Sequence, residues 1–276
     1  MAVTVVSERP GNASVLKTRA LSALVMAPPA LLAAWAGGYA FAALIALAAA
    51  LMCWEWHRML NGGFPLSGRV ASVGCAVASL LAVARPDIGL GFVALAALAS
   101  AGLAGDDRSG RSWAGFGAVY AGLPSVILVW LRADPVAGNA VIWWLLLVVW
   151  STDIGAYAFG RLIGGPKLLP MVSPKKTWAG LIGGMISAGL AAFLVALAVG
   201  AVAGAGVFGV GAAVAVVAQA GDLFESWIKR RCNVKDSSNI IPGHGGVLDR
   251  VDGLLTAALA VAALSLATGR TVLDWQ

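Results

Sequence analysis

Long, nearly uncharged apolar runs recur along this chain of 276 residues, and short polar segments separate them. A helix needs roughly 20 apolar residues to cross a bilayer core of about 30 Å. The runs show neither a heptad repeat nor an alternating period, which disfavours a coiled coil and an outer-membrane barrel. The pattern therefore predicts an all-α, polytopic membrane bundle of about nine helices. The predicted spans are 20–36, 39–54, 70–84, 88–105, 113–131, 140–159, 179–198, 203–224 and 253–269.

The same pattern divides the chain into two unequal parts. Residues 1–19 are polar and mildly basic, and we expect a flexible cytoplasmic arm there. Residues 20–276 are expected to form a single integral membrane domain, with the candidate catalytic residues at 150–253. The first apolar run contains Pro28 and Pro29 and is soon followed by another run, which argues against a cleavable signal peptide.

Composition agrees with this class. Hydrophobic residues make up 60% of the chain and charged residues 12%, against about 25% charged residues in soluble domains. Cys53, Cys75 and Cys232 are scattered, without the spacing of a metal site or a disulfide framework.

Basic residues predict which side of the membrane each polar segment occupies. With a cytoplasmic N-terminus, the nine spans leave Arg85, Arg132 and Arg270 on the far side, and the other 16 of the 19 basic residues face the cytoplasm. The net charge of +6 is explained by this topology and by anionic lipid headgroups, and does not imply a nucleic-acid partner. We expect the chain in the inner (cytoplasmic) membrane, with its polar clusters on the cytoplasmic face.

Acidic residues lie inside two of the spans, where a carboxylate costs about 2.5–3.5 kcal/mol. Asp222, Glu225 and Lys229 in "GDLFESWIK" form one helical stripe. Glu225 and Lys229 are spaced for an i, i+4 ion pair, whereas Asp222, one turn deeper, is expected to face a polar site. Asp153 in "WSTDIGAYAFG" has no basic neighbour in its span. We favour a shared polar site for Asp153 over a structural hydrogen bond.

The segment "MVSPKKTWAG" predicts a helix N-terminus with Ser173 as its N-cap and Pro174 as its first residue. Lys175 and Lys176 then fall in the first turn, where free backbone amides could bind an anion such as a phosphate between the lysines. The alternative is that these are ordinary lysines on the cytoplasmic side.

The segment "KDSSNIIPGHGGVLDRVDG" predicts a tight turn at the start of the last span. Its glycines let backbone amides approach a ligand closely. Asp249 and Asp252 follow the turn, and one or both could merely cap the helix. His244 is expected to hydrogen-bond within the turn, and without a second histidine nearby a zinc site is improbable. The turn residues are Pro242, Gly243, Gly245 and Gly246.

These clusters combine carboxylates with lysine and arginine on one membrane face. Carboxylates with few histidines suit Mg²⁺, a hard cation that prefers oxygen ligands. Basic side chains and helix N-termini suit phosphates. Such a set indicates nucleotidyl or phosphoryl transfer, where catalysis is mainly positioning and charge neutralisation. The residues alone indicate no particular substrate.

The run from Ser226 to Asp252 resembles the signature of phosphatidate cytidylyltransferases, also called CDP-diacylglycerol synthases. The segment from Asp153 to "SPKKTW" also looks like this family, so the resemblance covers residues 150–253 well. The N-terminal 140 residues resemble the family only in hydropathy, and Ala179 stands where relatives often have a polar residue. The matching positions are Ser226, Trp227, Ile228, Lys229, Arg230, Lys235, Asp236, Ser238, Ile241, Pro242, His244, Gly245, Gly246, Asp249, Arg250 and Asp252.

The resemblance implies that CTP and phosphatidate react to give CDP-diacylglycerol and pyrophosphate with Mg²⁺. It implies a two-metal site held by Asp222 and Asp249, whose second ion could be monovalent. Asp252 is a further candidate ligand, as are two of the catalytic residues, Asp153 and Asp236. The implied catalytic residues are Asp222, Asp249, Lys229, Asp236 and Asp153. The candidate substrate-binding residues are Lys175, Lys176, Thr177, Lys229, Arg230, Lys235, His244, Gly245, Gly246 and Arg250.

Two other functions are weighed against this one. A related CTP-dependent polyprenol or phytol kinase, or another lipid-phosphate transferase, would use similar chemistry but fits the phosphatidate-type signature less well. An ion-coupled transporter using Asp153 and Asp222 would need polar residues on a path to both faces, and the outer half of every span is almost bare of charge. The expected partners are CTP, phosphatidate and the lipid bilayer, with a homodimer left open and no nucleic acid.

Overall fold

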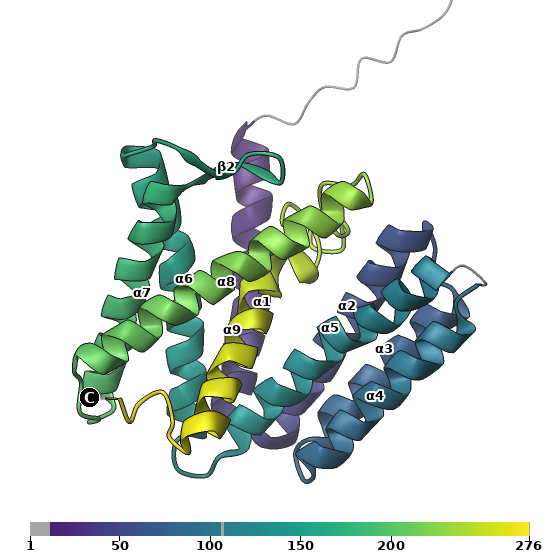
Figure 1. Cartoon of the computed structure of the whole chain (residues 1–276), viewed down its shortest axis with the longest axis horizontal. Coiled ribbons are helices and arrows are strands. Elements are labelled where there is room, and N and C mark those ends of the chain that lie inside the picture. The colour runs from purple at the N-terminus through teal and green to yellow at the C-terminus, as the bar shows by residue number, and fades with distance from the viewer. Residues whose placement is uncertain (1–11, 106–107, 276) are drawn as a thin grey trace, which may run out of the picture.

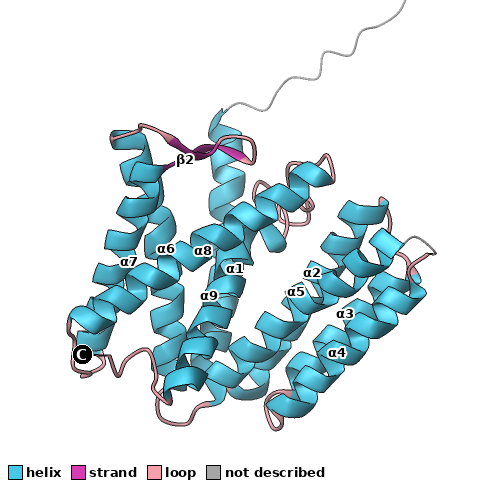
Figure 2. Cartoon of the chain, viewed as in Figure 1, coloured by secondary structure: helices cyan, strands magenta, loops and turns pink. Residues whose placement is uncertain are grey.

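The computed structural model describes residues 12–105 and 108–275, which form nine helices and one short β-hairpin (Figures 1 and 2). The all-α class predicted from the sequence is therefore confirmed, apart from the hairpin. The helices are α1 (Asn12–Ala36), α2 (Gly38–Asn61), α3 (Leu66–Leu81), α4 (Pro86–Leu103), α5 (Arg108–Ala133), α6 (Gly138–Leu162), α7 (Trp178–Ala198), α8 (Ala205–Arg231) and α9 (Leu248–Thr268). The strands are β1 (Lys167–Leu169) and β2 (Ser173–Thr177).

Seven helices within the described part of the chain are long and apolar enough to cross a membrane: α2 and α4 to α9. Two shorter apolar stretches, Leu24–Ala36 in α1 and Leu66–Leu81 in α3, coincide with the short first and third predicted spans. Each predicted span thus falls on a helix, as expected for an integral membrane protein. Nine complete crossings remain a prediction.

The N-terminal boundary differs from the predicted one. α1 begins at Asn12, so residues 12–19, which we assigned to a flexible arm, are helical. Residues 1–11 of the predicted arm lie outside the described residues. Hydropathy marks only the apolar part of a helix, so it did not predict the polar first turns of α1.

The predicted helix start at Ser173 and Pro174 is wrong. Residues Ser173–Thr177 form β2, which pairs antiparallel with β1. α7 begins at Trp178, and the hydroxyl of Thr177 accepts a hydrogen bond of 3.0 Å from the Gly180 amide as its N-cap. Threonine is itself a good N-cap residue, and proline is tolerated at the edge of a sheet. Lys175 and Lys176 therefore lie on a strand rather than in a first helical turn.

The helices form two packed groups (Figure 1). Helices α2 to α5 pack against one another, as do α6 to α9, and α5 contacts α9 to join the groups. Small residues allow close approach within the second group: a side chain at Gly155 of α6 would collide with Ser187 of α7, and one at Gly183 would collide with Phe159. These two glycines therefore serve the close packing of α6 against α7.

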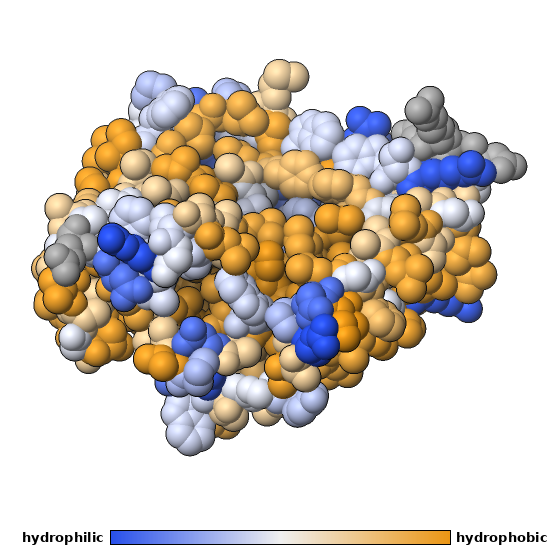
Figure 3. All heavy atoms as spheres, turned by 60° about the horizontal axis from the view of Figure 1, so that its bottom comes forward, coloured by the Kyte–Doolittle hydropathy of each residue, from blue (hydrophilic) through white to orange (hydrophobic). Residues whose placement is uncertain are grey.

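The start of α1 and the hairpin lie at one end of the bundle, and the C-terminus lies at the other (Figure 1). At the C-terminal end, Arg132 donates to the carbonyls of Ala34 and Trp35 at 2.7 and 2.6 Å, and Arg85 pairs with Asp87 at 2.7 Å. Figure 3, in which the C-terminal end comes forward, shows apolar side chains over most of the visible surface and polar side chains in separate patches.

The arrangement predicts opposite accessibility for two exposed loop residues. Met171 in the hairpin turn is 95% exposed, and Val136 between α5 and α6 is 92% exposed. In intact cells we expect an impermeant thiol reagent to label Val136→Cys but not Met171→Cys, which should react only after permeabilisation. The unsubstituted chain is the control for its native cysteines. Equal labelling of both variants from outside would contradict the predicted topology.

Candidate active site

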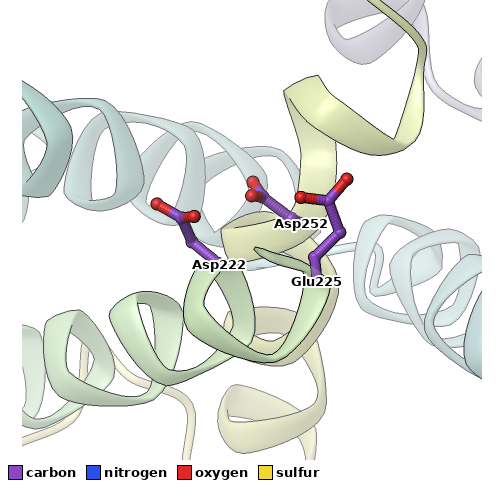
Figure 4. Close-up of side chains that lie close together, drawn as sticks. All are labelled: Asp222, Glu225 and Asp252. Atoms are coloured by element: carbon purple, nitrogen blue, oxygen red, sulfur yellow. The ribbon is translucent and has the colours of Figure 1, made fainter. Parts of the chain in front are cut away.

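Three carboxyl groups meet where α8 and α9 pack together (Figure 4). Asp222 and Glu225 come from α8 and Asp252 from α9, and one oxygen of each lies within 4.8 Å of the others. The i, i+3 spacing places the first two on one face of α8. We call these three residues the carboxylate cluster.

Glycines bring the two helices close enough to form this cluster. A side chain at Gly221 of α8 would collide with Thr256 of α9, and its Cβ would lie 2.9 Å from the carbonyl oxygen of Asp252. A Cβ at Gly253 of α9 would lie 3.3 Å from the carbonyl oxygen of Ala218. Each glycine is next to a residue of the cluster. The close backbone contact that the glycines allow therefore also brings the carboxyl groups together.

Two lysines pair with these acids. The Nζ atom of Lys229 lies 2.5 Å from Glu225 Oε2 and 2.6 Å from Asp249 Oδ1. The predicted ion pair of Glu225 and Lys229 is therefore confirmed, and the same ammonium group also links α8 to α9. The Nζ atom of Lys176, on β2, lies 2.6 Å from Asp222 Oδ2.

Acidic groups outnumber basic groups at this site. Among the described residues, four carboxyl groups from α8 and α9 are paired with, or adjacent to, two lysines. Four negative charges and two positive charges leave a formal net charge of −2 if every group is ionised. An oxygen-rich site of this charge suits a hard divalent cation such as Mg²⁺, which is commonly bound by one or two carboxylates together with phosphate oxygens.

Asp249 is not part of the carboxylate cluster. Its Oδ2 atom accepts hydrogen bonds from the Ser237 amide and hydroxyl, both at 2.9 Å, and from the Gly246 amide at 2.7 Å. Its Oδ1 atom accepts from Lys229. The structure thus brings Asp252, rather than Asp249, beside Asp222. The assignment of Asp249 as a metal ligand stays a prediction, because a carboxylate has further lone pairs to offer.

A cavity of about 200 Å³ opens next to the cluster. Its lining comes from α6, the β-hairpin, α7 and α8, and includes the predicted site residues Asp153, Lys175, Lys176 and Asp222. Thr177 also lines the cavity, although its hydroxyl is used as the N-cap of α7. A larger cavity of about 370 Å³ lies at the C-terminal end of the bundle, and its lining includes none of the predicted site residues.

The smaller cavity is also lined by two polar side chains that were not predicted from the sequence, those of Tyr157 and Gln219. Gln219 is 6% exposed, and in the described part of the chain its Nε2 atom has no hydrogen-bond partner. It therefore offers a buried donor to a ligand. Its position three residues before Asp222, on the same helical face, is a signal that could have identified it.

The predicted glycine turn is present beside the site. The Ile241 amide donates to the Gly245 carbonyl at 2.9 Å, and Gly243 and Gly245 have φ values of +75° and +83° that favour glycine. Arg250 donates from Nε and Nη2 to the His244 carbonyl at 2.8 and 2.6 Å. In this structure Arg250 and His244 therefore hold the turn together.

Several other predicted site residues are not among those that line the cavity. Arg230 is exposed at the end of α8 and donates to the Val234 carbonyl at 3.4 Å. Lys235 and Asp236 are exposed in the loop that follows. Gly246, at the end of the turn, is buried and donates to Asp249. The sequence signature thus combines residues of the site with residues that shape the adjoining loop.

Comparison with known proteins extends the similarity over nearly the whole chain. Residues 17–267 match the family model described as the cytidylyltransferase family. The phosphatidate cytidylyltransferase of Brucella suis is 41% identical over 246 residues, covering 88% of this chain and 90% of the relative. That of Pseudomonas aeruginosa is 38% identical over 285 residues, covering 92% and 98%. The similarity therefore includes the N-terminal half, where the sequence analysis found only shared hydropathy.

The cluster geometry predicts binding of a divalent cation. We expect the purified protein to bind Mn²⁺, used as a paramagnetic probe for Mg²⁺, and Asp222→Asn or Asp252→Asn to weaken binding by about tenfold or more. Asp87→Asn is a matched control, because Asp87 pairs with Arg85 at the opposite end. Free Mn²⁺ measured by electron paramagnetic resonance reports the affinity. Equal affinity in the cluster variants and the control would rule out this cation site.

Proposed function

Since the chain belongs to the cytidylyltransferase family, with phosphatidate cytidylyltransferases among its relatives over most of its length, we propose that it makes CDP-diacylglycerol and pyrophosphate from CTP and phosphatidate. The observation that carries this proposal is the meeting of the carboxylate cluster with Lys176 and the small cavity at one end of the bundle. A nucleotidyl transfer between two anionic substrates needs this combination of charges.

The reaction requires positioning more than covalent chemistry by the protein. A phosphate oxygen of phosphatidate attacks the α-phosphorus of CTP and forms a new P–O bond. The bond from the α-phosphorus to the oxygen that bridges to the β-phosphorus breaks, and pyrophosphate leaves with that electron pair. The attacking oxygen is already anionic, so the step needs no general base. The protein must overcome repulsion between the two substrates and align them.

Charged side chains around the cavity suit this task. Lys175 and Lys176 are on the hairpin strand and can bind phosphate oxygens, and the unpaired Nε2 atom of Gln219 can donate to the nucleotide. Asp222 and Asp252 would hold Mg²⁺, with Glu225, which pairs with Lys229, beside them. The bound ion would neutralise negative charge on the phosphates and connect them to the carboxylates.

The depth of the site supports a reaction between a lipid and a water-soluble nucleotide. Asp222 precedes the end of α8 by nine residues, or about 14 Å along the helix. Asp252 lies four residues inside α9, or about 6 Å from its start. We infer that these acids lie near the headgroup region of a bilayer, where the phosphate of a lipid lies. We propose that this end faces the cytoplasm from the inner membrane.

The fate of two labels tests the reaction. With purified protein, Mg²⁺ and phosphatidate, label from the α-phosphate of CTP should enter the lipid extract, and label from the γ-phosphate should leave as pyrophosphate. Transfer of the γ-label to lipid would identify a CTP-dependent kinase instead. A control without phosphatidate measures background incorporation.

Substitution of the acids tests their roles. Asp222→Asn and Asp249→Asn should each lower turnover at saturating Mg²⁺ by about 100-fold, the effect of losing one key electrostatic group. The double variant should be little worse than either single one. Glu225→Gln should have a smaller effect, because Lys229 keeps Asp249 as a partner.

These variants should still be expressed, since a neutral side chain is easier to insert into a membrane than a charged one. Turnover is measured by label incorporation into lipid, with Asp87→Asn as the unaffected control. Near-normal turnover of Asp222→Asn or Asp249→Asn would remove that residue from the site.

A further inference from the structure

Glu55 on α2 is a buried carboxylate that contacts the beginning of α9. Its side chain is 0% exposed. Its Oε1 atom accepts hydrogen bonds from the Ser238 hydroxyl at 2.7 Å and the Val247 amide at 2.8 Å, and its Oε2 atom accepts from the Leu248 amide at 2.8 Å. Glu55 therefore connects the α2–α5 group of helices to the loop and helix that carry Asp249 and Asp252.

The start of α9 needs such a partner because it lacks a cap of its own. The first amides of a helix have no acceptor within the helix, and Val247, at the N-cap position, has no side-chain acceptor. Glu55 provides acceptors from another helix, and its negative charge is favourable beside the positive end of the α9 dipole. Gly246 makes the approach feasible, since a side chain there would collide with Glu55 Oε1.

The contacts of Glu55 differ from those of a residue that acts on substrate. Its oxygens face a hydroxyl and two backbone amides, and it is not among the residues that line the small cavity. In the described part of the chain no ion pair is formed by Glu55. A buried charge compensated only by hydrogen bonds is costly to replace by a shorter or apolar group.

We propose that Glu55 is a positioning residue for the carboxylate cluster. It fixes the first turn of α9, and thereby the place of Asp252 relative to Asp222 and Glu225 on α8. Asp249 holds the same segment from the α9 side through the Gly246 amide. A small shift of α9 would separate the oxygens that meet at the cluster, and sites of this kind lose function when their supporting residues loosen. The proposal rests on the cation site and reaction proposed above.

Glu55→Gln tests the proposal because it keeps the size of the side chain but removes the charge and one acceptor. We expect amide hydrogen exchange in the peptide covering residues 237–249 to rise by about tenfold, measured by mass spectrometry on protein in lipid nanodiscs. Mn²⁺ affinity should fall by about tenfold. Turnover should fall by a similar factor, while the KM for CTP changes by less than about threefold.

His57→Leu is a matched control on the same helix. His57 is also 0% exposed, but its ring nitrogens contact the Cys53 carbonyl at 2.9 Å and the Ser100 hydroxyl at 3.2 Å, away from α9. It should lower the melting temperature without changing exchange at 237–249 or Mn²⁺ affinity. If Glu55→Gln behaves like this control, Glu55 only stabilises the fold and the proposal is wrong.

A milder variant keeps the test decisive if Glu55→Gln does not fold. Ser238→Ala removes one of the three hydrogen bonds to Glu55 and should raise exchange in the same peptide by a smaller factor. Unchanged exchange and unchanged Mn²⁺ affinity in Ser238→Ala would overturn the proposal. These two measurements do not depend on catalysis. A wild-type protein that fails to label lipid would therefore refute the proposed reaction without affecting the result for Glu55.

Discussion

A carboxylate within a membrane helix must be compensated by opposite charge or by hydrogen bonds, and the arrangement of this site follows from that requirement. Lys229 lies between Glu225 and Asp249 and thereby fixes α8 against α9. The Gly246 amide of the glycine turn, together with the amide and hydroxyl of Ser237, completes the hydrogen bonding of Asp249. The compensation is incomplete where α8 and α9 meet, because two lysines face four acids. The remaining negative charge lies beside the cavity, where a bound cation can balance it.

The sequence predicts the features that depend on local spacing. Hydropathy located the helices, and the i, i+3, i+7 stripe correctly placed Asp222 and Glu225 together and paired Glu225 with Lys229. Spacing within one helix does not reveal which of its faces turns toward a neighbour. Asp249 was implied as a metal ligand by the family resemblance and stays a prediction, whereas the closeness of Asp252 to Asp222 could not be read from spacing. Close contact between α8 and α9 at Gly221 and Gly253 places Asp252 beside Asp222.

Local sequence patterns also could not predict contacts between segments that are distant in the sequence. Ser173 and Pro174 have the local signature of a helix start, but pairing of β1 with β2 and the capping of α7 by Thr177 delay the helix. Glu55 has no signal except a charge at the end of an apolar run. Its role depends on three groups that lie more than 180 positions away in the sequence.

We propose that the acids of α8 and α9 bind the cation that links the protein to the phosphates. Anomalous scattering from crystals grown with Mn²⁺ and CTP tests this, because it locates the ion and its ligands in one experiment. We predict a Mn²⁺ peak within about 2.5 Å of oxygens of Asp222 and Asp252, with the α-phosphate of CTP on its open side. A CTP-bound structure whose Mn²⁺ is coordinated without any acid of α8 or α9 would contradict the claim.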